Sequence, residues 1–272
     1  MLGKVFERIE AYRDNATKTE LKLVDKLKSI DRNDMIYLSI TDLADTLGVA
    51  EATILRFCRK LGYKGFQDFK LHLSQDIATD TVDDTSKPKR LSDEMADAIA
   101  QTCKQLDYDV CLAVADKIIA ARKLCVFAVG NSQIAALAAK ARLIKAGINA
   151  ENATDNHTQA IIAANLDADD LLILFSVSGG TLDVIKLAEI AHGNGTPVVV
   201  VTNYSKSPLS KYADYLLYTS RKEAAYEGGS LATVASQIYI TDVLCTAVYE
   251  RLGVRATANA RKASQAVSDK SV

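Results

Sequence analysis

The stretch that decides the fold is LLILFSVSGGT, residues 171 to 181. Residues 171–175 form a continuous apolar run, which is typical of a parallel strand buried on both faces, and residues 182–191 have helical spacing. The loop between them therefore joins a strand to a helix. Free N–H groups and the helix dipole favour an anion at such a junction, and Ser176, Ser178 and Thr181 can donate hydroxyl hydrogen bonds to it. The stretch predicts a phosphate-binding loop.

Composition and charge are those of an ordinary globular chain. The 272 residues suffice for one large or two ordinary domains, and 49% of them are hydrophobic. The formal net charge is -1, so any nucleic-acid binding is confined to a local basic patch. Five cysteines without a CxxC pair favour reduced, mostly buried thiols. We find no signal peptide and no apolar run of about 18 residues, so we expect a cytoplasmic protein without a membrane span. The cysteine pattern does not favour a zinc site, and we expect neither a metal nor a cofactor.

Two different patterns divide the chain. Residues 1–78 contain helical periodicity at 20–27, 41–47, 52–61 and 66–73, and they predict an all-α domain. Residues 79–91 are polar, carry Pro88 and predict a linker. Residues 256–272 predict a mobile tail or a marginal helix.

Residues 92–255 alternate strands with helices. Strands are predicted at 123–129, 148–152, 171–175, 197–202 and 215–218, with helices beginning near residues 132, 157, 182 and 207 and longer helices at 92–121 and 230–252. This alternation predicts an α/β domain, a three-layer α/β/α sandwich with a five-stranded parallel sheet. Its ligand site is expected beyond the carboxyl ends of the strands.

Residues 41–62 predict a helix-turn-helix. Ala44 lets the helices approach, Gly48 can take the positive φ of the turn, and Gly62 ends the second helix. Five basic residues against two acidic ones between positions 51 and 70 form the local patch that contacts to DNA phosphates require. A solvated amphipathic helix pair is the alternative. The residues predicted to meet DNA are Thr41, Glu51, Thr53, Arg56, Arg59, Lys60 and Lys64, and Lys70 follows them on the same patch.

Four pieces of the α/β domain point to one pocket. They follow the first, third and fourth predicted strands and precede the last long helix. Hydroxyls and helix-terminal amides select a phosphate, and a carboxylate selects the hydroxyls of a sugar. We therefore expect a phosphorylated sugar as ligand. The residues predicted to bind it are Gly130, Asn131, Ser132, His157, Ser176, Ser178, Gly179, Thr181 and Glu223.

Two motifs carry a family resemblance. Ser-x-Ser-Gly-x-Thr at 176–181, followed by Thr-Asn-x-x-x-Ser-Pro-Leu at 202–209, resembles the SIS (sugar isomerase) domain, whose fold is flavodoxin-like. Residues 40–70 resemble the helix-turn-helix of RpiR-type regulators, which carry a SIS domain behind it. The resemblance spans nearly the whole chain. It implies a bacterial transcription factor that senses a phosphosugar, forms dimers or tetramers, and uses Ser132, Ser176, Ser178 and Thr181 as phosphate ligands.

The chain departs from the family pattern at four positions. Ala128 replaces the first glycine of Gly-x-Gly-x-Ser, which can shift the ligand. Ala50 stands where many relatives have Ser or Thr, and so lacks a hydroxyl that caps the recognition helix. Glu227 and Val234 stand where arginines are frequent, which leaves the pocket less positive.

Rival interpretations give some of these residues other roles. Asp155-Asn-His157 resembles the Asp-x-His of many relatives, so His157 contacts the sugar, carries protons or is structural. A nucleophilic Ser176 lacks the Gly-x-Ser-x-Gly elbow, and nucleotide-binding motifs are missing. We predict no catalytic residue. The chain is interpreted as a regulator that docks Arg56 in the major groove of an operator. The rivals are an aldose-ketose isomerase with Glu223 or His157 as base, and an adaptor for protein partners.

Overall fold

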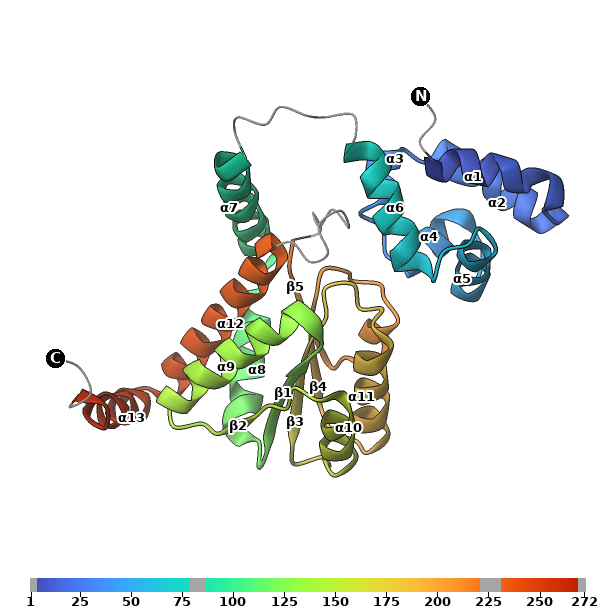
Figure 1. Ribbon diagram of the computed structural model, residues 1–272. Coiled ribbons are helices and arrows are strands. Elements are labelled where there is room, and N and C mark those ends of the chain that lie inside the picture. The colour runs from blue at the N-terminus through green and yellow to red at the C-terminus, as the bar shows by residue number, and fades with distance from the viewer. Residues whose placement is uncertain (1–3, 79–86, 221–230, 269–272) are drawn as a thin grey trace. The chain divides into compact units, whose positions relative to one another are not determined.

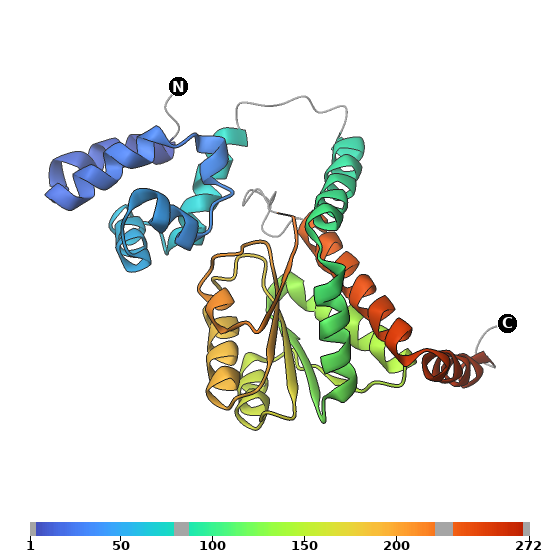
Figure 2. The ribbon, with the colours of Figure 1, turned by 180° about the vertical axis from the view of Figure 1, so that it is seen from behind.

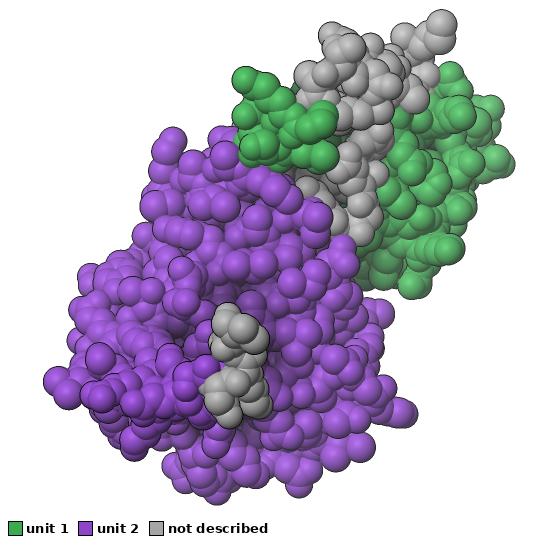
Figure 3. Space-filling view, turned by 60° about the vertical axis from the view of Figure 1, so that its left-hand side comes forward, with its two compact units in different colours: residues 1–93, 221–230 green, residues 94–220, 231–272 purple. Residues whose placement is uncertain are grey.

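The computed structural model describes residues 4–78, 87–220 and 231–268. These residues fall into two compact units, which Figure 3 shows in separate colours. Among the described residues, unit 1 holds 4–78 and 87–93, and unit 2 holds 94–220 and 231–268. Each unit has a hydrophobic core of its own.

Unit 1 is all-helical, as predicted. Phe6, Leu23, Leu43, Phe57 and Phe69 are fully buried in its core. The predicted helices at 20–27, 41–47 and 66–73 are present with longer bounds, and the one at 52–61 is present one residue earlier. Helices α1 and α3 are not among the predicted elements. The helices are α1 (Lys4–Tyr12), α2 (Lys18–Ser29), α3 (Arg32–Met35), α4 (Ile40–Leu47), α5 (Glu51–Lys60) and α6 (Phe66–Ala78).

Unit 2 contains a five-stranded sheet in which every pair of neighbours is parallel. The strands are β1 (Leu124–Ala128), β2 (Ala150–Glu151), β3 (Leu171–Phe175), β4 (Val198–Thr202) and β5 (Tyr215–Tyr218), in the order β2-β1-β3-β4-β5. This is the flavodoxin-like order. The principal helices are α7 (Lys87–Gln105), which begins in unit 1, α8 (Tyr108–Ala120), α9 (Gln133–Lys145), α10 (Asn156–Ala164), α11 (Leu182–Gly193), α12 (Leu231–Leu252) and α13 (Val254–Gln265).

Helices cover both faces of the sheet, which makes the predicted three-layer sandwich (Figures 1 and 2). Alternate strand residues point to opposite faces, so each strand supplies two cores. Val126, Ile173 and Val199 belong to the core shared with α8, α9 and α12. Phe127 and Leu174 belong to the core shared with α10 and α11. Burial on both faces explains why these strands are uninterrupted apolar runs.

The helices that flank the sheet differ from prediction in three places. The single helix expected over 92–121 is two helices, because the side chain of Asp107 accepts hydrogen bonds from the N–H groups of Asp109 and Val110 and caps the start of α8. The stretch near Ser207 forms only the short 3-10 helix η4 (Leu209–Tyr212). The C-terminal segment forms α13 over residues 254–265, which is the helical one of its two expected forms and begins two residues before position 256.

The predicted linker coincides only in part with described residues. Residues 79–86 lie outside them. Residues 87–91 are helical and begin α7. Pro88 is compatible with this position, because the N–H group that proline lacks has no partner in the first turn of a helix.

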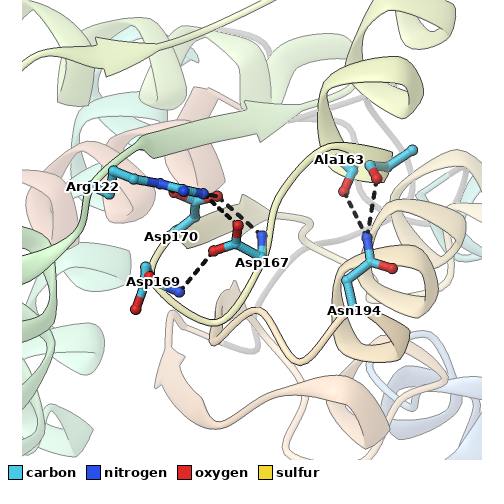
Figure 4. A network of polar contacts seen from close by, with 7 residues as sticks. Arg122, Ala163, Asp167, Asp169, Asp170 and Asn194 are labelled. Carbon is cyan, nitrogen blue, oxygen red and sulfur yellow. Dashed lines mark hydrogen bonds and ion pairs between the residues drawn. The ribbon is translucent and has the colours of Figure 1, made fainter.

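A polar network connects the amino ends of the strands, which we call the amino edge of the sheet, as opposed to the carboxyl edge where the strands end (Figure 4). Arg122 precedes β1, and its guanidinium donates to both carboxylate oxygens of Asp170, which precedes β3, at 3.0 and 2.9 Å. The same guanidinium contacts Asp167 at 2.5 Å, and Asp167 N–H donates to Asp170 at 3.0 Å. The Asp170 side chain is fully buried, and the arginine holds its pKa below the usual value. The network therefore joins the starts of β1 and β3. Figure 4 also shows Asn194 donating to the carbonyl of Ala163.

Helix α12 is the core helix of unit 2. Its length and apolar composition alone would allow it to cross a membrane, and it is the one described helix for which this holds. However, it packs against α8 and α9, and it buries Gln237 and Thr241 along with its apolar residues. Its hydrophobicity is thus used inside the domain.

The five cysteines are free thiols. Cys58, Cys111, Cys125 and Cys245 are buried, and Cys103 is exposed. Burial raises the pKa of the Cys58 and Cys125 thiols to about 12. These two thiols are therefore packing residues, as the odd cysteine count predicts.

Candidate ligand site and nucleic-acid interface

The strand order places the topological switch point of the sheet between β1 and β3. After β1 the chain continues to β2 on one side, whereas β3 is followed by β4 and β5 on the other side. Such a switch point opens a crevice outside the carboxyl ends of the two strands. Ala128 pairs with Phe175 in the last register position, so the loops that begin at Val129 and Ser176 leave the sheet side by side. These are two of the loops predicted to bind the ligand.

The loop after β3 holds a buried hydroxyl without a partner. Ser176 is 4% exposed, and among the described residues its Oγ has no hydrogen-bond partner. Ser178 Oγ accepts a bond from Gly180 N–H at 3.1 Å, which leaves its own hydrogen free to donate. Thr181 is the N-cap of α11, but its side chain makes no capping bond. Three hydroxyls are therefore available beside the positive end of α11.

The loop after β3 requires a glycine at position 179. Its φ is +57°, and a Cβ at this position would lie 2.2 Å from Ser207 Oγ. Its carbonyl accepts from Leu209 N–H at 3.0 Å. The loops after β3 and β4 thus pack too closely for any side chain at position 179.

The loop after β1 is tied to α12. Gly130 has φ +64°, and it begins the short 3-10 helix η3 (Gly130–Ser132), in which Asn131 is exposed and Ser132 is 7% exposed. Ser132 Oγ accepts a hydrogen bond from Gln237 Nε2 at 3.1 Å. The Ser132 hydroxyl therefore keeps its hydrogen for another acceptor.

The helix-turn-helix has the predicted turn. Gly48 ends α4 with φ +67°, and Val49 N–H donates to Ala44 O at 3.0 Å. Gly62 follows α5 with φ +88°, and the next N–H donates to Cys58 O at 3.0 Å. These bonds are those of helix ends closed by a left-handed glycine. Thr41 Oγ1 donates to Glu51 at 2.7 Å, which ties α4 to α5.

The basic residues of this region divide into exposed and engaged groups. Arg56, Arg59 and Lys64 are exposed. Lys60 Nζ lies 2.7 Å from the Glu20 carboxylate, and this hydrogen bond is the main reason that the pKa of Glu20 is lowered to about 2. Lys70 is 3% exposed and donates to Leu38 O at 2.9 Å. The prediction that Lys70 lies on the exposed basic patch is therefore wrong. Its ammonium is instead bound to the loop between α3 and α4.

Comparison with known proteins matches both units. A sequence model for the helix-turn-helix domain of the rpiR family matches residues 3–80, and one for the SIS domain matches residues 117–247. An uncharacterized HTH-type transcriptional regulator of Clostridium perfringens is 32% identical over 277 residues, covering 97% of this chain and 98% of that protein. The chain belongs to the RpiR family of transcriptional regulators. The helix-turn-helix is therefore its DNA-binding domain, and the sheet unit is its SIS domain.

Solved structures share the fold of this chain. Vibrio vulnificus NanR complexed with ManNAc-6P has a TM-score of 0.88 at 27% identity, covering 99% of this chain and 100% of NanR. The sugar isomerase domain of an RpiR transcription factor from Sphaerobacter thermophilus has a TM-score of 0.60 at 24% identity. It covers 66% of this chain and 99% of that one, and the likeness is one of fold.

The positions where the chain departs from the RpiR pattern have these surroundings. Ala50 is the N-cap of α5 and makes no side-chain capping bond. Ala128 is buried at the end of β1, and its carbonyl accepts from Gln159. Val234 is 4% exposed within α12. The predicted ligand residue Glu223 lies outside the described residues, and so does Glu227.

His157 lies at the start of α10, where the preceding Asp155 caps the helix. Asp155 accepts from Thr158 N–H at 2.8 Å, and the bonds from Thr158 lower its pKa. His157 is exposed, and its contact with a ligand stays a prediction.

Sequence reasoning missed several polar residues of both sites. Lys26 Nζ donates to Leu47 O at 2.5 Å and so fixes the end of α4. Gln133, Gln159 and Gln237 gather around the carboxyl end of β1. Their signal is weak, because single glutamines within helical patterns look like ordinary surface residues.

Proposed function

We propose that this chain is a cytoplasmic transcriptional regulator whose SIS domain binds a phosphorylated sugar and thereby changes operator affinity. One observation carries the ligand half of the proposal. The Ser176 hydroxyl is buried, has no partner among the described residues, and stands at the switch point beside the start of α11. A buried polar group without a partner costs about 1 to 3 kcal/mol, which a bound acceptor would recover.

The expected ligand joins an anion to a polyol. A phosphate accepts hydrogen bonds from Ser176, Ser178 and Thr181 and is favoured by the N-terminus of α11. The Ser132 hydroxyl is a fourth donor. The complex of the similar NanR with ManNAc-6P supports this ligand class. We keep Gly130, Asn131, Gly179, His157 and Glu223 as proposed neighbours of the sugar.

The DNA half rests on α5. Its exposed face carries Arg56 and Arg59, with Lys64 just beyond its end. We assign Arg56 to a base contact and the other two to phosphates, along with Thr53 at the start of the helix. Thr41, Glu51 and Lys60 are engaged in ties between helices, so we assign them to the support of α5.

A homodimer or homotetramer would present two such helices to an operator with two similar half-sites. Ligand can switch this assembly only through unequal affinity for two arrangements of the DNA-binding domains. We assign no catalytic role to the site, in keeping with the relatives named as regulators.

The test measures operator binding with and without ligand. The full chain is titrated by fluorescence anisotropy against DNA from upstream of its own gene, with a panel of hexose and N-acetylhexosamine 6-phosphates. One sugar phosphate should shift the operator Kd by about 5- to 150-fold. Arg56→Ala should abolish specific binding, while Arg261→Ala, the same charge change on the exposed side of α13, should preserve it. Equal operator binding with every sugar phosphate would refute the sensing role.

A further inference from the structure

Two glutamines share an anchor at the end of β1. Gln159 Nε2 donates to Ala153 O at 2.7 Å and to Ala128 O at 3.0 Å. Gln133 Nε2 donates to the same Ala153 O at 2.9 Å and to Asn152 Oδ1 at 3.1 Å. The two side-chain amides are therefore neighbours. Both NH₂ groups are bound by oxygen atoms at the end of β1 and just after β2.

Gln237 adds a third amide from α12. It is fully buried in a helix that is otherwise mainly apolar, and its Nε2 donates to Ser132 Oγ at 3.1 Å. Ser132 directly precedes Gln133 in the chain. All three glutamines thus surround the loop that leaves β1.

The carbonyl oxygens of these amides are left without partners. Oε1 of Gln133, Gln159 and Gln237 is shielded from solvent and has no hydrogen bond among the described residues. Unpaired buried acceptors are unfavourable in the ligand-free chain, and a group that can donate would satisfy these three, which belong to residues around the loop that leaves β1. An ionised phosphate has no such donor, whereas each hydroxyl of a sugar has one.

The two sides of the crevice therefore differ in chemistry. The loop after β3 offers hydroxyl donors beside a helix N-terminus, which suits a phosphate. The surroundings of β1 offer buried acceptors, which suit the polyol end of the same molecule. This difference would orient the ligand at the switch point, with its phosphate toward the loop after β3 and its sugar toward β1.

We propose that Gln133, Gln159 and Gln237 recognise the sugar by accepting hydrogen bonds from its hydroxyl groups, while the phosphate lies on the loop from Ser176 to Thr181. The inference rests on the proposed function, because it divides that one site into two halves. The three carbonyls are shielded, so an entering sugar must displace neighbouring groups. Such a displacement would act on α9, α10 and α12, which carry the three glutamines, and a sensor domain can respond to such a change.

The experiment compares a sugar phosphate with inorganic phosphate in one set of variants. Gln159→Met and Gln237→Met remove the acceptors at similar side-chain volume. Thr196→Val is the matched control, because Thr196 Oγ1 is also buried without a partner but precedes β4 at the opposite edge of the sheet. Binding of a panel of hexose and N-acetylhexosamine 6-phosphates and of inorganic phosphate is measured by calorimetry on the full chain. Circular dichroism verifies folding.

Each glutamine variant should lose roughly tenfold or more in affinity for the tightest sugar phosphate. The affinity of Gln159→Met for inorganic phosphate should stay within about twofold, because Gln159 contacts no proposed phosphate ligand, and the control should change neither affinity. A series of monodeoxy sugar phosphates, each lacking one hydroxyl, is compared with the parent sugar phosphate. At least one of them should bind the wild type more weakly than the parent does. Gln237→Met should bind that compound and the parent equally well, because the missing hydroxyl and the missing carbonyl are hydrogen-bond partners.

Three other results would overturn the inference. Unchanged sugar-phosphate affinity in both variants would mean that the carbonyls hold only water. Equal losses for sugar phosphate and inorganic phosphate would make the glutamines mere supports of the loop. In both cases the wild type still binds a sugar phosphate, so the proposed function stands. A wild type that binds no member of the panel refutes the proposed function, and this inference with it.

Discussion

The two edges of the SIS sheet use polar residues in opposite ways. At the amino edge, Arg122 and Asp170 are joined by two hydrogen bonds, and Asp167 completes the network. At the carboxyl edge, Ser176, Gln159 and Gln237 keep buried atoms without partners among the described residues. The same strands connect both edges, so the difference does not arise from the sheet itself. We interpret the amino edge as serving stability and the carboxyl edge as serving the proposed ligand.

Among the described residues, Thr196 departs from this pattern, because its hydroxyl is buried and unpaired at the amino edge. A single such atom is common in native proteins, whereas a cluster at a switch point is not. The exception is useful, because it supplies a control with the same local defect in another place.

The largest expected effect is the loss of stability when the polar network at the amino edge is removed. Asp170→Ala should lower the free energy of unfolding by about 3 kcal/mol, because it removes a fully buried carboxylate from its arginine and from Asp167 N–H. Urea unfolding of the full chain measures the loss. Sugar-phosphate affinity should be preserved below the unfolding transition. A drop in ligand affinity as large as the drop in stability would show that the two edges are not separate.

The next effect concerns the carboxyl edge. Ser176→Ala should leave the ligand-free stability unchanged or slightly raised, because it removes an unpaired hydroxyl. Affinity for a sugar phosphate should fall roughly 10- to 100-fold, as expected for a lost hydrogen bond to a charged group. Calorimetry and thermal unfolding on the same samples give both quantities. Thr196→Val should show the same small stability change with full ligand affinity.

The same distinction between engaged and available polar groups applies to the basic residues of the DNA-binding domain. Glu20→Gln should cost about 1 to 2 kcal/mol at pH 7, because the charged Glu20 is stabilised mainly by Lys60. The folded pKa of about 2 lies below the ordinary value of 4.5, so this contribution is complete above pH 4.5 and is lost as the pH falls toward 2. Unfolding of variant and wild type is compared at several pH values. A difference that grows as the pH falls would contradict the assignment.

The smallest expected effect is the gain in stability when a capping side chain is added at the start of α5. Ala50→Ser should raise the free energy of unfolding of the DNA-binding domain by about 0.5 to 1 kcal/mol, because a serine hydroxyl can accept from an N–H group in the first turn of α5, where Ala50 makes no side-chain capping bond. Thermal unfolding measures the gain. Ala50→Val is the control, since valine brings no side-chain hydroxyl and is as poor an N-cap residue as alanine. A gain equal to that of the serine variant would exclude the hydroxyl as the cause.

Local patterns were enough to predict much of the fold. β3 and β5 have the predicted bounds, because apolar runs and their flanking turns are local signals. The turn of the helix-turn-helix follows from Gly48 and Gly62 in the same way. β2 is shorter than predicted, with two residues at the edge of the sheet that pair only with β1.

The parts that sequence could not give depend on contacts between distant residues. Lys60 meets Glu20 across 40 positions, and Gln237 meets Ser132 across 105. Spacing along one helix cannot show that a lysine is engaged or that a glutamine is buried. The break at Asp107 was missed for a different reason, because apolar periodicity continues through the two helices and only the cap reveals the boundary.

The most direct test of the account is an operator titration in the presence and absence of sugar phosphates, carried out with the wild type and with Ser176→Ala. We predict that one sugar phosphate shifts the operator Kd of the wild type by at least about fivefold, and that the variant binds the same operator equally well but needs roughly 10- to 100-fold more ligand for the shift. A wild type whose operator affinity ignores every sugar phosphate, or a variant that responds at the same ligand concentration as the wild type, would contradict it.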